Sequence, residues 1–395
     1  KRWKKKKKTD YQPKIATLEV DYEKREVGSE LLFEGTSEKG PFDRLDPNPG
    51  FYEIVKTLVL SVTLLPIRLL IVATIFGILL LLSKLWAAIN NERIFSRGAL
   101  TFFIRVSSRS VLFVCGFYWI EVYGDAKLKK GTPIIVSSHV SIWEVLYFCS
   151  SALCPSYVFK NDCLTVPVIG EVALGALQGI NVDNKNSSGG GSAPLIKRIE
   201  EMEEAGPESD YRPLLIFPEG TTGNGSSIIS FRSGSFVPGA PVKPVLVSMP
   251  FKHFSPSYES IYTQVLVVRS LCQFYNRMQV RYLEDYIPSE EEKNDPKLYA
   301  ENVRNIIAYA SNLPMCDASY ADKRAFHKRL EARLANHRLG WLSNFIHVNP
   351  PVLEEESSME KLVYQYRRPR RIIKAEKEDS SDDIDSLDMS TPLLA

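Results

Sequence analysis

The apolar stretch from Ile54 to Ile89 constrains this chain more than any other feature, because so dense a run needs either a large core or a lipid bilayer. Pro66 and Arg68 interrupt it, and Lys84 closes it. The uncharged run 69–83 has 15 residues, fewer than the ~20 that an upright membrane-spanning helix needs. Almost no polar face would remain around such a helix, which argues against a buried helix of a soluble domain. We therefore predict that the chain is attached to a membrane.

The sequence leaves the mode of attachment open. Either one kinked helix spans the bilayer with Arg68 near an interface, or two half-helices form a hairpin that enters one leaflet. A second apolar patch, 110–120, is too short to span and ends in Phe117, Tyr118 and Trp119. Aromatic residues of this kind favour the headgroup level of a membrane. This patch predicts an interfacial helix or, equally, a core helix that faces the rest of the protein.

The net charge of +2 hides an uneven distribution of charge. Seven of the first eight residues are basic, whereas 376–388 is strongly acidic. A basic run of this kind suits an anionic membrane surface, a nucleic acid or a solvated tail. Both ends of the chain lack apolar periodicity, so we predict disorder over 1–50 and 341–395. We expect the membrane, and no nucleic acid, as a partner.

The six cysteines form no CxxC pair and show no metal-ligand spacing, so we predict neither a metal site nor a disulfide framework. Free cysteines are typical of a reducing, cytosolic compartment. We also expect no cleavable signal peptide before the apolar stretch, which begins near residue 51.

From residue 125 to 312 short apolar strands alternate with helical patterns, which is typical of an α/β domain. The composition, with 44% apolar residues, suffices for a core. Strands are predicted near 133–137, 156–159, 178–182, 213–217, 242–248, 263–269 and 278–284. Helices are predicted near 142–152, 193–205, 296–310 and 317–335. We therefore predict a mixed sheet flanked by helices.

One histidine of this domain lies at a strand-to-helix corner. The β-branched block 134–136 predicts a buried strand, and His139 comes between it and a helical pattern. Ser141 and Glu144 fit the capping box that opens such a helix. The corner lets the imidazole of His139 meet the carboxylate of Glu144, which a continuous helix would point ~140° away. This pair fits a base that removes a proton from a hydroxyl group, or a corner histidine beside a helix-capping glutamate.

A second block, 214–225, repeats this arrangement, because an apolar strand runs into the turn Phe217-Pro218-Glu219-Gly220-Thr221. Together the two blocks resemble those of the glycerolipid (PlsC-type) acyltransferase superfamily, a His-x4-Asp motif and a Phe-Pro-Glu-Gly-Thr motif at about this separation. The resemblance extends from 51 to 329 and is strongest to lysophosphatidylethanolamine and lysophosphatidylcholine acyltransferases. Further blocks that carry it are 116–120, 231–236 and 288–304.

The resemblance implies a glycerol-3-phosphate acyltransferase-like fold with membrane helices at the N-terminus. It implies acyl transfer from acyl-CoA to the free hydroxyl of a lysophospholipid, with His139 as the base and Glu144 as the residue that orients it. Acyl-CoA is then a co-substrate, and no cofactor is expected. The remaining site residues that it implies are substrate-binding ones, whose cations would pair with phosphate: Lys160, Lys185, Glu219, Gly220, Thr221 and Arg232.

Two positions depart from the family pattern. Glu144 replaces the usual aspartate, which shifts the geometry by about an ångström and gives the carboxylate a competing role as a helix cap. Asn184 stands where the family has a phosphate-binding arginine and leaves Lys185 as its substitute. Lys160 and Arg232 also fit ordinary surface cations. An inactive, lipid-binding homologue is therefore an alternative to an enzyme, and an enzyme that acylates lysophosphatidate is another.

The sequence thus divides the chain into six parts. They are a disordered basic tail (1–50), a membrane helix or hairpin (51–92), an interfacial helix region (93–124), the catalytic domain (125–312), a C-terminal helix (313–340) and a disordered tail (341–395). We expect the protein in the endoplasmic reticulum membrane, with its catalytic domain in the cytosol. Oligomeric state, headgroup and acyl-chain preference do not follow from the sequence.

Overall fold

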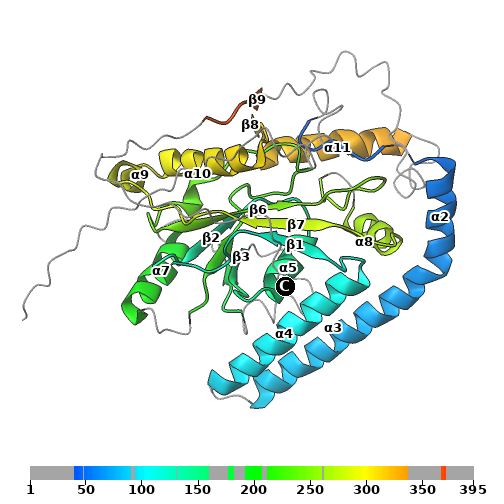
Figure 1. Ribbon diagram of the computed structural model, residues 1–395, viewed down its shortest axis with the longest axis horizontal. Coiled ribbons are helices and arrows are strands. Elements are labelled where there is room, and N and C mark those ends of the chain that lie inside the picture. Colours follow the sequence, from blue (N-terminus) through cyan, green and yellow to red (C-terminus); the bar gives the residue numbers. More distant parts are fainter. Residues whose placement is uncertain are drawn as a thin grey trace, which may run out of the picture.

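The computed structural model describes residues 40–47, 49–89, 94–129, 131–159, 177–181, 192–206, 211–259, 262–336 and 366–370. At its centre lies a seven-stranded sheet in the order β1-β7-β6-β2-β5-β3-β4 (Figure 1). The strands are β1 (Ile120–Tyr123), β2 (Ile134–Ser137), β3 (Ser156–Phe159), β4 (Ile180–Asn181), β5 (Leu214–Ile216), β6 (Val242–Ser248) and β7 (Met278–Tyr282). All neighbouring strands are parallel except β6 and β7, which are antiparallel. The predicted mixed sheet is confirmed.

Strand β2 lies in the middle of the sheet, and all four of its residues are buried. Its side chains alternate between two cores, as the two-residue period of a strand requires. Ile135 packs in one core with Trp143 and Phe148, whereas Ile134 packs in the other with Tyr299. A central parallel strand is covered on both faces, which is why its sequence is a continuous apolar run.

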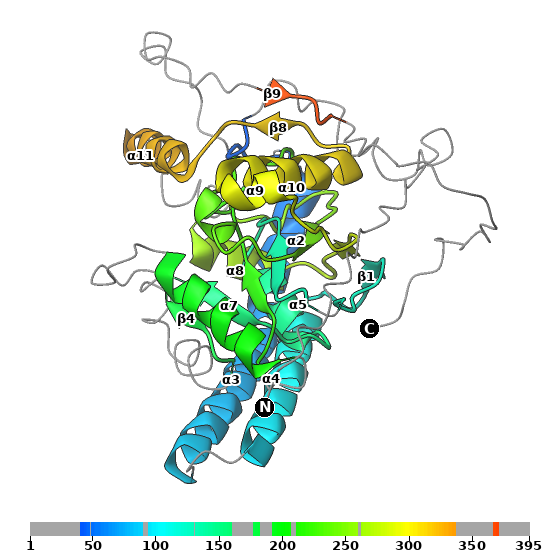
Figure 2. The same cartoon turned by 90° about the vertical axis from the view of Figure 1, so that its left-hand side faces the viewer.

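Helices cover both faces of the sheet (Figures 1 and 2). Helices α4 (Ile94–Val114) and α5 (Trp143–Ser150) supply side chains to the core that contains Ile135. Helices α7 (Ala193–Ala205) and α10 (Pro296–Ser311) supply the opposite core. The other elements of the domain are η6 (Ser233–Ser235), α8 (Thr263–Leu271), α9 (Glu290–Asn294), β8 (Met315–Cys316), α11 (Tyr320–Asn336) and β9 (Tyr366–Arg367).

The segment predicted as a strand near 263–269 is helix α8 instead. Its valines favoured a strand, because β-branched residues are enriched in sheets. In the structure Leu266, Arg269 and Ser270 are buried together, at the three- and four-residue spacing of one helix face. Burial along that face outweighs the strand propensity of the valines. The other predicted strands and helices overlap observed elements.

The apolar stretch forms two successive helices, α2 (Phe51–Val62) and α3 (Leu64–Ile89). Pro66 lies in the first turn of α3, where its missing N–H interrupts no helical hydrogen bond. The chain therefore does not reverse direction at Pro66, as a hairpin of two half-helices would require. Instead α4 lies beside α3 in an antiparallel pair (Figures 1 and 2). Over 64–85, α3 has 22 residues whose length and composition suit a membrane span, and few of them are buried.

Arg68, the charge that interrupts the apolar stretch, binds the protein itself. It is 5% exposed, and its guanidinium donates to the carbonyl oxygens of Leu271 at 2.7 Å and Gln273 at 2.6 Å. A further bond of 2.8 Å reaches the hydroxyl of Tyr118. Arg68 thereby anchors α3 to the chain that follows α8, and the apolar remainder of α3 stays free of charged side chains as far as Lys84.

Two short segments of the predicted tails belong to the folded domain. Residues 40–47 pack against it with Phe42 at 0% exposure. Residues 366–367 form β9, which pairs with β8 in an antiparallel ladder. The disorder prediction is wrong for these two segments, because their partners are distant in sequence and leave no local pattern. Apart from 49–50 and 368–370, the rest of both predicted tails lies outside the described residues.

Candidate active site

His139 follows the carboxyl end of β2, and the turn 217–221 follows the carboxyl end of the neighbouring β5. The two strands are parallel and in register, with Val136 opposite Ile216. Clefts of α/β proteins form at the edge where the carboxyl ends of such strands meet. The sheet therefore brings together two sequence blocks that are far apart along the chain.

The ring of His139 is held on two sides. Its Nδ1 lies 2.8 Å from Oε1 of Glu144, and its face stacks on the ring of Phe217 with centroids 4.1 Å apart. Because Nδ1 faces a carboxylate, we assign the ring proton to Nδ1, which leaves Nε2 as the basic nitrogen. The side chain is 20% exposed, and no residue in the described part of the chain binds Nε2. This nitrogen is open to a substrate.

Glu144 is fully buried and uses both carboxylate oxygens. Oε1 accepts from the backbone N–H of Val140 at 2.7 Å and of Ser141 at 2.8 Å, in addition to His139. Oε2 accepts from the N–H of Ser141 at 2.9 Å. The two roles that the sequence set in competition, orienting the imidazole and capping the chain before α5, are thus performed by one carboxylate. The added methylene relative to aspartate is accommodated in this geometry.

Ser141 makes only half of the predicted capping box. Glu144 does reach back to its N–H, but the Ser141 hydroxyl donates to the carbonyl oxygen of Pro256 at 2.5 Å. The hydroxyl is therefore engaged by a distant loop, 254–259, instead of the first turn of α5. That loop is a part of the site that the sequence did not single out.

Glu219 lies beneath the backbone of His139. It is 4% exposed, and its Oε1 accepts from the His139 N–H at 3.1 Å. Burial raises the pKa of Glu219 to about 8, while the His139 N–H and the positive charge of Arg304 oppose that rise. In this structure the carboxyl group supports the histidine backbone. Its contact with the acceptor substrate stays a prediction.

Gly220 and Arg232 lie against each other. Gly220 has φ +65°, and a Cβ on it would come within 2.5 Å of Nε of Arg232. Only glycine allows both this left-handed backbone and the close passage of the guanidinium. Arg232 is exposed, and no carboxylate of the described residues pairs with it. Thr221 is half-buried in the same turn, so a cation and a hydroxyl lie at the turn where the sequence predicted phosphate binding.

A buried lysine that the sequence did not single out lies behind this turn. Lys323, from α11, donates to the carbonyl oxygen and Oγ1 of Thr222 at 2.8 and 2.7 Å, and to the carbonyl oxygen of Tyr258 at 3.0 Å. Burial lowers the pKa of Lys323 to about 8. In the sequence it is one of many charges on a polar helix, so no local signal marks it.

Two predicted phosphate-binding residues, Lys160 and Lys185, lie outside the described residues. The same holds for Asn184, which replaces the arginine of the family pattern. Their roles therefore stay predictions.

A histidine that is fixed by a buried carboxylate and open at Nε2, at the carboxyl edge of a mixed sheet, has the geometry that a general base requires. Residues 119–248 match the protein family described as Acyltransferase, and this range contains both sequence blocks. The chain therefore carries a PlsC-type acyltransferase domain, and the resemblance stated from its motifs is confirmed.

Several characterised proteins are similar to this chain. Lysophospholipid acyltransferase LPEAT1 of Arabidopsis thaliana is 33% identical over 59% of this chain and 64% of its own length. LPEAT2 of the same plant is 31% identical over 76% of this chain and 56% of its own length. Human lysophosphatidylcholine acyltransferase 2 is 33% identical over 70% of this chain and 53% of its own length. The chain thus spans between about half and two thirds of these relatives.

A solved structure is also similar, that of the 1-acyl-sn-glycerophosphate acyltransferase PlsC from Thermotoga maritima. It is 18% identical, with a TM-score of 0.44, and covers 65% of this chain and 97% of its own.

Proposed function

We propose that this protein transfers an acyl group from acyl-CoA to the free hydroxyl of a lysophospholipid, lysophosphatidylethanolamine or lysophosphatidylcholine. The observation that carries the proposal is the 2.8 Å contact between Nδ1 of His139 and Glu144, with Nε2 open beside the turn 217–221. The relatives' names, lysophospholipid and lysophosphatidylcholine acyltransferases, support the choice of substrate.

The reaction needs no covalent enzyme intermediate, because a thioester is already activated. Nε2 of His139 removes the proton of the lysophospholipid hydroxyl while its oxygen attacks the thioester carbonyl. The tetrahedral intermediate then expels the coenzyme A thiolate, which takes up the proton from the imidazolium. The buried carboxylate of Glu144 keeps Nδ1 protonated and stabilises the imidazolium between the two steps.

The acceptor would bind along the turn that follows β5. The exposed guanidinium of Arg232, held against Gly220, would pair with the phosphate of the lysophospholipid, and the hydroxyl of Thr221 lies in the same turn. Lys160 and Lys185, which lie outside the described residues, would add positive charge for the phosphate. No cofactor takes part in this scheme.

We propose that α3 and α4 hold the protein in the endoplasmic reticulum membrane, with the catalytic domain on the cytosolic side. Exposed apolar side chains support this, among them Leu70, Ile78 and Leu81 of α3, at 69%, 53% and 67% exposure. A groove of about 670 Å³ between α3, α4 and the end of α5 has an apolar lining that suits fatty acyl chains. The described cysteines are all unpaired, as a reducing compartment favours.

The membrane proposal has its own test. Alkaline carbonate extraction of membranes separates an embedded protein, which stays in the pellet, from a peripheral one, which is released. Protease protection of tags at both ends then distinguishes a span from a hairpin that returns to the same face. Release at alkaline pH would contradict the role given to α3 and α4.

The catalytic proposal is tested with labelled oleoyl-CoA and a panel of acceptors that includes lysophosphatidylethanolamine, lysophosphatidylcholine and lysophosphatidate. We expect turnover with one of the first two, and its loss in His139→Ala. His253→Ala is the matched control, because that histidine is exposed and, among the described residues, makes a polar contact only with Glu53, at 3.9 Å. Turnover that survives His139→Ala would overturn the proposed base. No turnover with any acceptor would favour a lipid-binding homologue. A preference for lysophosphatidate would identify that lipid as the acceptor instead.

A further inference from the structure

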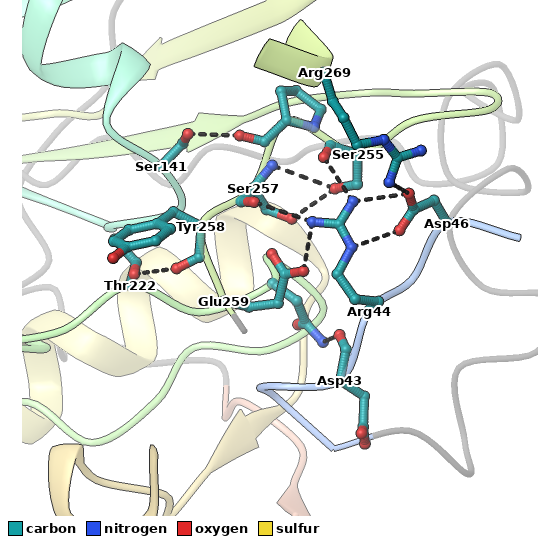
Figure 3. A network of polar contacts seen from close by, with 12 residues as sticks. Asp43, Arg44, Asp46, Ser141, Thr222, Ser255, Ser257, Tyr258, Glu259 and Arg269 are labelled. Atoms are coloured by element: carbon teal, nitrogen blue, oxygen red, sulfur yellow. Dashed lines mark hydrogen bonds and ion pairs between the residues drawn. The ribbon is translucent and has the colours of Figure 1, made fainter. Parts of the chain in front are cut away.

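The segment 40–47, which precedes α2, packs beside the candidate active site, against the loop 254–259 and Asn224. We call it the N-terminal strap. Phe42, Arg44 and Asp46 are 0%, 6% and 3% exposed. Figure 3 shows Arg44 and Asp46 on one side of a group of polar contacts, with Ser141 and Thr222 on the opposite side.

The side chain of Arg44 binds the loop 254–259, which we call the clamp loop. Its guanidinium binds the strap itself through Asp46, with two bonds of 2.7 and 2.8 Å. It also lies 2.7 Å from Oε1 of Glu259. The guanidinium also donates hydrogen bonds to the carbonyl oxygens of Ser255 at 3.0 Å and Ser257 at 3.4 Å. One side chain of the strap therefore contacts three alternate residues of the clamp loop (Figure 3).

The clamp loop in turn holds the two residues that follow His139. The N–H of Tyr258 donates to the carbonyl oxygen of Val140 at 2.8 Å, and the Ser141 hydroxyl donates to Pro256 at 2.5 Å. The hydroxyl of Thr222 donates to the carbonyl oxygen of Tyr258. The histidine block and the block after β5 are thus tied to the same loop.

The strap also contacts Asn224, in the block that follows β5; we call these contacts its second arm. The side-chain amide of Asn224 donates to the carbonyl oxygens of Gly40 at 2.8 Å and Asp43 at 2.9 Å. Its backbone N–H donates to Pro41 at 2.9 Å. The preceding residue, Gly223, donates its N–H to the carbonyl oxygen of His139 at 3.0 Å.

The charges of the network are buried and balanced. Arg44 and Arg269 face Asp46 and Glu259, with Arg269 3.6 Å from Asp46. Both guanidinium groups also lie over the ring of Phe254, at 5.5 and 4.5 Å. Buried ion pairs add little net stability over an apolar packing, so a role in fixing one geometry explains their presence better than stability does.

We propose that the N-terminal strap positions His139 for catalysis, with Arg44 acting as a positioning residue through the clamp loop. This inference rests on the proposed function, because it supposes that His139 is the base. Removing Arg44 frees the carbonyl oxygens of Ser255 and Ser257, and the loop loses its hold on Val140 and Ser141. A displacement of about 1 Å at a reacting group is able to cost on the order of 100-fold in rate.

The test compares Arg44→Gln and Arg44→Lys with a matched control in the full-length protein. Lys243→Gln is the control, because Lys243 forms an equally buried pair with Asp285 at 2.9 Å but contacts neither the strap nor the clamp loop. For each variant kcat and KM are measured with the preferred lysophospholipid, together with the melting temperature. Hydrogen exchange of the backbone over 139–144 is followed in the same preparations and needs no turnover.

We expect Arg44→Gln to lower kcat by about 10- to 100-fold, with KM within about threefold of wild type. Arg44→Lys keeps the positive charge but loses the forked N–H donors of the guanidinium, so its kcat should lie between those of Arg44→Gln and wild type. Hydrogen exchange over 139–144 should speed up in Arg44→Gln and not in Lys243→Gln. We expect the two variants to lose a comparable amount of melting temperature, while the kcat of Lys243→Gln stays within about twofold of wild type.

Equal kcat for Arg44→Gln and Lys243→Gln, or unchanged exchange over 139–144, would overturn the strap proposal. If wild type itself shows no turnover, the proposed function fails and the exchange measurement alone decides on the strap. Should Arg44→Gln not fold, Asn224→Ala removes the second arm without leaving a buried charge. It should lower kcat and speed the same exchange, and normal values for both would again overturn the proposal.

Discussion

The carboxyl group of Glu219 accepts a hydrogen bond from the backbone N–H of His139, across 80 positions of sequence. The bond joins the two sequence blocks of the site, that of His139 and that of the turn 217–221. It also means that the Glu219 side chain, buried and turned toward the protein, supports the catalytic corner from below.

Replacing Glu219 should remove a pH dependence of stability. Its pKa is about 8, above the ordinary value of 4.5, so the stability it contributes is full below pH 4.5 and is lost as the pH rises to about 8. We expect the melting temperature of wild type, relative to that of Glu219→Gln, to fall over this interval. If the melting temperatures of the two proteins change equally with pH, this prediction is contradicted. Measurements should stop near pH 8, because Lys323, whose pKa is lowered to about 8, adds stability above that pH.

Glu144→Gln should lower kcat on the order of 100-fold with little change in KM. The amide oxygen in the place of Oε1 can still accept a bond from His139, but the NH₂ in the place of Oε2 then meets the N–H of Ser141, so that two donors face each other. Glu144→Asp keeps the charge and should retain more activity than the amide. Steady-state kinetics of the three proteins decide the point, and equal rates for wild type and Glu144→Gln would show that the carboxylate charge does not assist His139.

Gly220→Ala should raise KM for the lysophospholipid roughly tenfold, a loss of about 1.4 kcal/mol in binding. A methyl group there would lie 2.5 Å from Nε of Arg232 on a backbone with φ +65°, so it displaces the guanidinium from the turn. Gly234→Ala is the control, since nothing lies within 4 Å of a Cβ at that position. The same KM for both variants would remove Arg232 from the acceptor site.

Arg68→Leu should lower the free energy of unfolding by about 2–4 kcal/mol. The substitution leaves the buried carbonyl oxygens of Leu271 and Gln273 without their donor. Arg277→Leu is the comparison, because Arg277 is exposed and only lies over the ring of Tyr275. Thermal unfolding in detergent gives both values. Equal melting temperatures would show that α3 is not anchored through Arg68.

Much of the fold and the core of the site could be predicted from local patterns. The block 134–136 is apolar because β2 is covered on both faces, and His139 and Glu144 meet because a corner separates them. The failure at α8 has the same origin, since propensity is a local quantity and the burial of Leu266 and Ser270 is not. The disorder predicted for 40–47 failed because the strap is stabilised by residues more than two hundred positions away, as the bond from Arg44 to Ser255 shows.

By itself the sequence determined where strands β2 to β7 and most helices lie, which residues pair at the corner after β2, and which helix is apolar enough for a membrane. These properties follow from hydrophobic period and from contacts within one turn of chain. Only the tertiary structure decided that Glu219 supports His139, that Arg68 and Lys323 are buried, and that Arg44 clamps the loop beside the catalytic block. Such polar partners meet through strand register and packing, and a buried polar group takes whichever partner the fold places within reach.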